Sequence, residues 1–68
     1  MSVAKIIEIS ASSSKSFSDA VENGIAQAND TLDNISGAWV KEQKVDCEDG
    51  KISKYRVTLK VTFVLKGD

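Results

Sequence analysis

The run from Lys54 to Lys66 constrains the fold more than any other feature, because apolar and polar residues alternate along it. Its apolar residues share one side of an extended chain: Tyr55, Val57, Leu59, Val61, Phe63 and Leu65. This alternation predicts a β-strand with one buried face. Such a strand reaches about 43 Å at ~3.3 Å per residue, which is more than so short a chain can cover by itself. We therefore expect a β-rich protein that associates with further copies of itself.

The size of the chain supports the same expectation. Its 68 residues suffice for a single domain, residues 1–68, with a core of modest stability. Cys47 is the one cysteine and histidine is absent, so neither a disulfide within the chain nor a zinc site with four soft ligands is available. Contact between identical subunits is the remaining source of additional stability.

The charge balance excludes two classes of partner. A formal net charge of −1 provides no overall field that favours nucleic acid or an anionic membrane surface. The apolar run before Glu8 is too short for a signal peptide or a membrane span. We therefore expect a cytoplasmic protein with no nucleic-acid and no membrane partner.

The first half of the chain predicts a strand followed by a helix. Residues 3–10 are apolar on both sides, which predicts an inner strand. Ser13 or Ser14 is then expected to cap a helix. Apolar residues recur at helical spacing from there: Phe17, Val21, Ile25, Ala28, Leu32 and Ile35. Gly24 indicates a close approach to the helix backbone, and Gly37 is expected to end the helical segment.

The second half predicts a β-hairpin. A strand over residues 38–47 is followed by Asp49-Gly50, a strong turn signal, and then by the alternating strand. The order is β-α-β-β, and the fold class is α+β with an antiparallel pairing of the last two strands.

No residue pattern points to catalysis, since there is no histidine and no phosphate-binding glycine loop. We expect a protein that is not an enzyme. The acidic residues near the hairpin, Asp46, Glu48 and Asp49, are expected to form a solvated turn in preference to a cation site. Cys47 is expected to be a small buried hydrophobic residue. The cations Lys41, Lys44, Lys54, Arg56 and Lys60 are expected to form cross-strand pairs, or otherwise to gather about an anionic ligand.

Trp39 is the residue most open to a functional interpretation. On a regular strand it shares a mostly polar face with Gly37, Lys41 and Gln43. An indole on such a face serves either as an anchor at a subunit interface or as a platform for an aromatic ligand. We favour the interface and keep both alternatives.

The whole chain resembles the dodecins, a family of small flavin-associated proteins. The similarity lies in residues 25–28 with Thr31-Leu32, in residues 48–50, and in residues 55–65. It implies a three-stranded antiparallel sheet partly wrapped around one helix, with twelve copies forming a hollow homododecamer.

The resemblance also implies a ligand. Flavin-binding dodecins resemble one another in a tryptophan that stacks on the flavin and a glutamine at its polar edge. Counted back from the hairpin, these two positions fall on Gly37 and Arg56, with Trp39 two residues later as a displaced platform. The candidate ligand-binding residues are therefore Trp39, Arg56, Gly37 and Gln43, and the candidate cofactors are FMN or riboflavin. A branch of the family without the stacking tryptophan implies the alternative, a shell that binds calcium or has a purely structural role.

Overall fold

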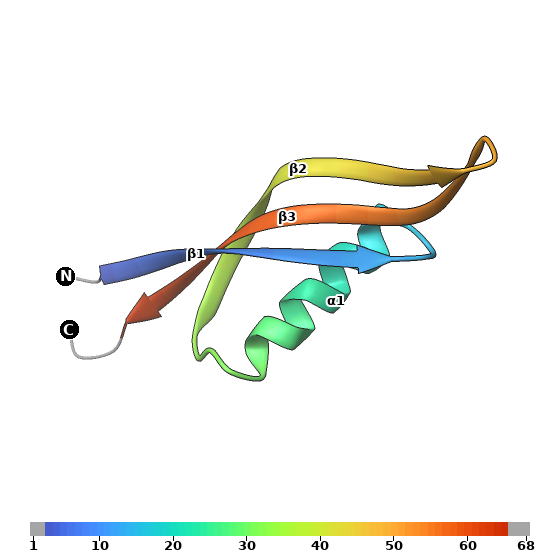
Figure 1. Cartoon of the computed structure of the whole chain (residues 1–68). Coiled ribbons are helices and arrows are strands. Elements are labelled where there is room, and N and C mark those ends of the chain that lie inside the picture. The colour runs from blue at the N-terminus through green and yellow to red at the C-terminus, as the bar shows by residue number, and fades with distance from the viewer. Residues whose placement is uncertain (1–2, 66–68) are drawn as a thin grey trace.

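The computed structural model describes residues 3–65, in which one helix lies against one face of a three-stranded antiparallel sheet (Figure 1). The elements are β1 (Val3–Ser13), α1 (Phe17–Asn29), β2 (Ile35–Glu48) and β3 (Lys51–Leu65). The strand order is β1-β3-β2, so β3 pairs with both of its neighbours. The predicted α+β class and β-α-β-β order are confirmed.

The alternating run forms the central strand, and its apolar side forms the core. Val57, Leu59 and Val61 are buried on β3, and Ala20 of α1 joins them in the core. The prediction of an inner strand at residues 3–10 was wrong, because β1 lies at the edge of the sheet. Its residues Val3 and Ile6 are 52% and 51% exposed. The apolar residues of β1 are therefore partly exposed in the described chain, and they are not the mark of an inner strand.

The helix begins later than the serine run predicts. The N-cap is Ser16, whose Oγ accepts a hydrogen bond from the backbone N–H of Asp19 at 3.0 Å. Neither Ser13 nor Ser14 caps the helix, because β1 continues to Ser13. The Ser13 hydroxyl instead accepts from the Lys15 N–H at 2.9 Å and donates to the Asp19 carboxylate at 2.6 Å. These bonds fix the turn between β1 and α1.

The helix also ends earlier than predicted. Its C-cap is Asp30, and the Ala28 carbonyl accepts the N–H groups of both Thr31 and Leu32, which tightens the chain into a turn. Asn34 then adopts a φ of 61°, in the left-handed region, and β2 starts at the next residue.

Three expectations for this segment were therefore wrong. Leu32 lies in the connection, and Ile35 and Gly37 lie in β2, so Gly37 does not end the helix. The helical spacing continued past Ala28 because Ile35 packs on the same core as the helix, although from a strand.

The helix covers only part of the sheet. Thirteen helical residues extend about 20 Å at ~1.5 Å per residue, whereas the 15 residues of β3 extend about 50 Å. α1 packs on β1 and β3, and Val40 of β2 is 42% exposed although it is in register with the buried Leu59. The folded chain is accordingly long and thin, 53 × 19 × 13 Å.

The predicted hairpin is confirmed. Asp49 and Gly50 have φ values of 53° and 76°, as a two-residue turn of type I′ requires at both central positions. The hairpin projects beyond the helix (Figure 1). For that reason the expectation for Cys47 was wrong: this cysteine is exposed, since no other element covers that end of β2. In the described part of the chain, no helix is long and apolar enough to cross a membrane.

Candidate functional site

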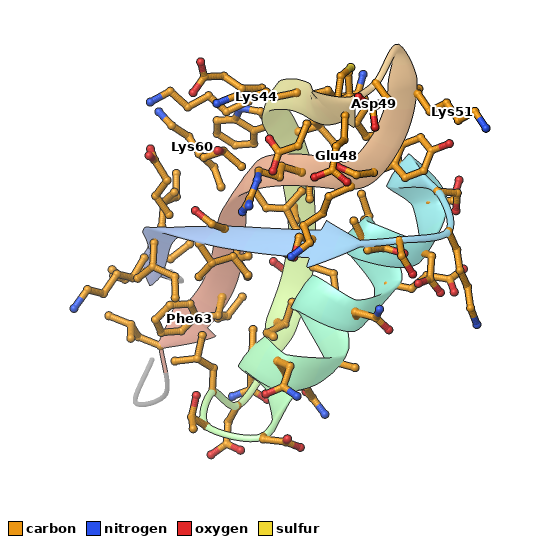
Figure 2. All side chains as sticks on the ribbon, turned by 45° about the vertical axis from the view of Figure 1, so that its right-hand side comes forward. Lys44, Glu48, Asp49, Lys51, Lys60 and Phe63 are labelled. Carbon is orange, nitrogen blue, oxygen red and sulfur yellow. The ribbon has the colours of Figure 1, made fainter. Side chains whose placement is uncertain are left out.

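The face of the sheet opposite α1, hereafter the open face, carries the candidate ligand-binding residues. Residues that pair across antiparallel strands point to the same side of the sheet. The open face is therefore built from three-residue rows, which include Glu8–Lys60–Trp39, Ser10–Thr58–Glu42 and Ser12–Arg56–Lys44. Figure 2 shows Lys44 and Lys60 on the side of the sheet away from α1.

A bulge in β2 changes which residues reach this face. The register shifts between Val40 and Glu42, so that Lys41 is an extra residue with no partner on β3. After the bulge, Gln43 pairs with the buried Val57 and points to the side that α1 covers. The expectation that Trp39 and Gln43 share a face was wrong, because the alternation is reset at Lys41.

Trp39 lies on the open face with half of its surface accessible. It is 51% exposed and lies directly across from Lys60, whose Nζ is 5.8 Å from the centre of the indole ring. This distance is within the range of a cation–π interaction. Gly37, two positions earlier, faces the same side, and a Cβ there would have no neighbour within 4 Å. One side of the indole therefore borders open space.

An ion pair spans the sheet beside the indole. The Lys41 ammonium lies 3.2 Å from the Glu8 carboxylate, with both side chains nearly half exposed. The bulge makes this contact possible, because Lys41 is released from the regular row and reaches across β3 to β1.

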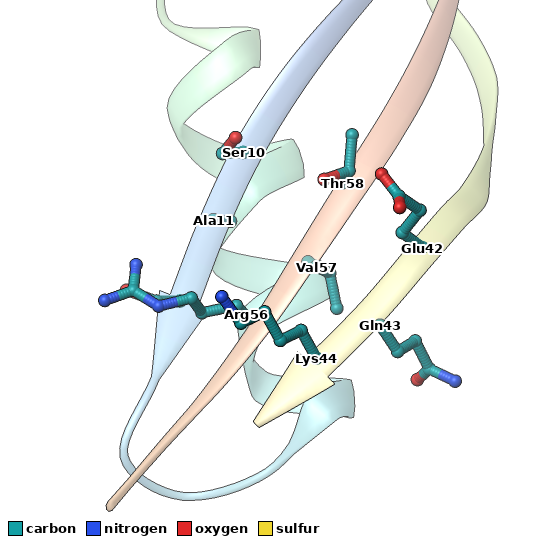
Figure 3. A pocket seen from close by; sticks show the side chains of 9 residues that line it. Ser10, Ala11, Glu42, Gln43, Lys44, Arg56, Val57 and Thr58 are labelled. Carbon is teal, nitrogen blue, oxygen red and sulfur yellow. The ribbon is translucent and has the colours of Figure 1, made fainter. Parts of the chain in front are cut away.

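Arg56 belongs to a separate part of the open face. Its Nε donates to the Asp46 carboxylate at 2.8 Å, and Lys44 is its direct partner across the strands. Arg56 and Lys44, together with Glu42, Thr58 and serines of β1, line a hollow of about 340 Å³ (Figure 3). Of the cations expected to form cross-strand pairs, Arg56 and Lys41 do so, with Asp46 and Glu8 as their partners.

Only some of the four candidate residues are brought together. Trp39 and Gly37 are neighbours on one face, whereas Arg56 is four positions from Lys60 along β3, or roughly 13 Å at ~3.3 Å per residue. Gln43 is on the opposite face. Lys60 was not predicted as a site residue. If β2 and β3 are paired regularly outward from the Asp49-Gly50 turn, Lys60 falls directly opposite Trp39, so the sequence contained a signal for it.

A second, apolar hollow lies on the helix side of the sheet. It has a volume of about 310 Å³ and lies between α1 and the start of β2. Its lining includes Val21, Ile25, Ile35, Val40 and Leu59. It marks the part of β2 that the helix leaves uncovered.

Within residues 3–65, acidic side chains do not assemble into a metal site. Among residues 3–65, no group of three or more histidine, cysteine, aspartate or glutamate side chains is placed to hold a metal ion. Glu48 and Asp49 are exposed at the hairpin, and Asp46 is held by Arg56.

Comparison with known proteins places this arrangement in a family. The calcium dodecin of Mycobacterium tuberculosis is 37% identical over 67 residues, covering 97% of this chain and 93% of the relative. Its crystal structure, described as that of a calcium-chelating antigen with a calcium-binding site, matches with a TM-score of 0.81 at 34% identity, over 97% of this chain and 94% of that chain.

Other solved dodecins are still more similar in shape. The dodecin of Streptomyces davaonensis matches with a TM-score of 0.92 at 32% identity, over 97% of each chain. An arginine-to-alanine variant of the dodecin of Thermus thermophilus matches with a TM-score of 0.93 at 27% identity, over 98% of this chain and 100% of that chain. The model of the dodecin family matches residues 3–66, and the chain therefore belongs to the dodecin family.

Proposed function

We propose that this protein is a binding protein, not an enzyme, that assembles as a hollow homododecamer and sequesters a flavin, either riboflavin or FMN. The observation that carries the proposal is the half-exposed indole of Trp39 on a sheet face that no element of the subunit covers. Family membership supports both the assembly and the class of ligand.

The uncovered surface supports self-association. Large apolar side chains are between 40% and 52% exposed on all three strands: Val3, Ile6, Trp39, Val40, Ile52 and Leu65. Val3 and Leu65 are direct partners across β1 and β3 and form a contiguous exposed apolar pair, and contiguous exposed apolar surface is typical of interaction sites. The apolar hollow beside Val40 provides a recess into which a neighbouring subunit can insert side chains. Association therefore completes the core that α1 leaves unfinished.

The surroundings of Trp39 support a planar ligand. An indole contributes about 0.5–1.5 kcal/mol through ring stacking beyond the area that it buries. Gly37 leaves free space beside the ring for such a ligand. Lys44 and Arg56 are direct partners across β2 and β3, where like charges repel each other. Asp46 balances part of this charge through its ion pair with Arg56, and an anionic group of a ligand, such as a phosphate, would balance the rest.

In this proposal the protein stores its ligand without changing it chemically. A flavin held against an indole is shielded from solvent, and the indole can quench its excited state. The binding residues are Trp39 as the platform, Gly37 as the adjacent space, and Arg56 as a polar contact. Gln43 is not included, because it points to the helix side of its own subunit.

The experiment combines native mass spectrometry with titration of riboflavin fluorescence. A particle of about twelve subunits that quenches riboflavin is expected, and Trp39→Ala should abolish the quenching. Gln43→Ala is the matched control, since it changes the other face of the same strand. A monomer in dilute buffer, or unchanged riboflavin fluorescence in the presence of the assembled protein, would contradict the proposal. If Trp39→Ala dissociates the particle, Trp39 is an interface anchor.

Calcium binding is the second candidate function, favoured by the similarity to calcium dodecin. Because one subunit brings no group of suitable ligands together within residues 3–65, calcium would be held by carboxylates of neighbouring subunits. Glu48 and Asp49 at the projecting hairpin are two of the exposed carboxylates that could contribute to such a site. A melting temperature that rises with calcium and not with riboflavin would favour this function over the first.

A further inference from the structure

Lys60 occupies one of the two sides of the Trp39 indole on which a ligand could stack. The two residues are direct partners across β2 and β3, and the ammonium lies 5.8 Å from the centre of the indole. A ring stacked on the indole lies about 3.5–4 Å from it, which is closer than this ammonium. A ligand that stacks on this side of Trp39 therefore displaces the Lys60 side chain from the ring.

The carboxylate that could neutralise Lys60 is already engaged. Glu8 is the partner of Lys60 on β1, but its Oε1 is bound by Lys41 at 3.2 Å. The ion pairs found within residues 3–65 are Lys41–Glu8 and Arg56–Asp46, and Lys60 takes part in neither. The described contact of its ammonium is therefore the cation–π interaction with Trp39.

We propose that Lys60 makes the Trp39 site selective for planar ligands that carry an anionic group. This inference rests on the proposed binding of a planar ligand at Trp39 and specifies that the preferred planar ligands are anionic. A neutral ligand that displaces Lys60 removes the cation–π interaction and gives the ammonium no new partner. An anionic ligand replaces that interaction with an ion pair, which the flexible lysine side chain can form after it swings off the ring.

Riboflavin and FMN are suitable probes, because they share the same ring system and differ by one phosphate. Dissociation constants for both are measured by fluorescence titration with the assembled protein at low and at physiological salt. In the unaltered protein FMN should bind about 5- to 10-fold more tightly than riboflavin at low salt, with a smaller preference at physiological salt because ions screen exposed charges.

The variants separate Lys60 from general charge effects. Lys60→Gln should reduce the preference for FMN to about 2-fold or less, whereas Lys60→Arg should retain it. Lys51→Gln is the matched control: it removes the same charge from an exposed position of the same strand, roughly 30 Å away at ~3.3 Å per residue. Native mass spectrometry of each variant checks that the assembly is intact.

The outcomes distinguish the inference from the function on which it rests. Equal affinity for the two flavins in the unaltered protein, or an FMN preference that survives in Lys60→Gln, would overturn the role of Lys60 while leaving flavin binding in place. A preference lost in Lys44→Gln but kept in Lys60→Gln would assign the phosphate to the hollow beside Arg56. If neither flavin binds, the proposed function fails and the selectivity of Lys60 fails with it.

Discussion

Gly24 provides a test of how tightly the helix packs on the sheet. It lies in the middle of α1 and is buried against β1 and β3. A Cβ at this position would lie 3.0 Å from the Cβ of Ala11 and 3.2 Å from Cδ1 of Leu59. Carbon atoms in ordinary contact are about 3.5–4.0 Å apart. Gly24→Ala therefore requires a shift of roughly half an ångström at the helix–sheet contact.

Two effects of opposite sign determine the result. Replacing glycine by alanine inside a helix stabilises it by about 0.5–1 kcal/mol. Overpacking a core costs about 1–3 kcal/mol. The Ala11 methyl group cannot rotate away, and Leu59 is fully buried, so relief has to come from movement of the backbone. We expect overpacking to dominate, with a net loss of about 1 kcal/mol and a decrease in melting temperature of about 4–8 °C.

The measurement is thermal or urea denaturation at one fixed protein concentration, because the stability of a self-associating protein depends on its concentration. Ala11→Gly provides the partner for a double-mutant cycle, since it removes the nearest of the three atoms. In the double variant the two changes should be coupled favourably by at least about 0.5 kcal/mol. The reasoning is refuted if Gly24→Ala raises the stability by the full helix-propensity gain, or if the cycle shows no coupling.

The helix cap and the hairpin turn provide two further predictions. Ser16→Ala should cost about 1 kcal/mol because it removes the oxygen that accepts the Asp19 N–H, whereas Ser14→Ala should change the free energy of unfolding little; urea denaturation of both compares them directly. Gly50→Ala should destabilise by about 1–2 kcal/mol because its φ is 76°, whereas Gly37→Ala, which meets open space, should be neutral or slightly stabilising. Equal melting temperatures for Gly50→Ala and Gly37→Ala would show that the turn does not depend on glycine.

The sequence was sufficient to predict elements whose cause is local. The alternation around Leu59 predicted the central strand, and the turn chemistry of Asp49-Gly50 predicted the hairpin and its antiparallel pairing. The helix was predicted with a wrong end, because periodicity reports only that a residue faces the core. Ile35 faces the same core from a strand. The chain changes from helix to strand through the left-handed backbone conformation of Asn34. This conformation does not alter the spacing of apolar residues, so the hydrophobic pattern could not predict it.

The candidate site was predicted less completely for a related reason. Trp39 and Gly37 lie before the bulge, and their shared face followed from simple alternation. Gln43 lies after the bulge, so its face depends on the unpaired Lys41. A lysine at this position does not indicate a bulge, and the sequence alone therefore predicted the wrong face for Gln43. The edge position of β1 was also missed. Apolar residues on both faces are typical of a strand inside a sheet, but β1 carries them at the edge, where Val3 and Ile6 remain exposed.

The bulge at Lys41 inserts a charged residue into β2 without exchanging its neighbours between the two faces of the sheet. Because Lys41 has no partner on β3, its deletion would join Val40 directly to Glu42 in regular alternation, and Trp39 and Lys44 would keep their present side. The deletion would remove the ammonium that reaches across β3 to Glu8. Related chains that are one residue shorter at this point should accordingly keep the same outward-facing residues and lack this cation beside the indole.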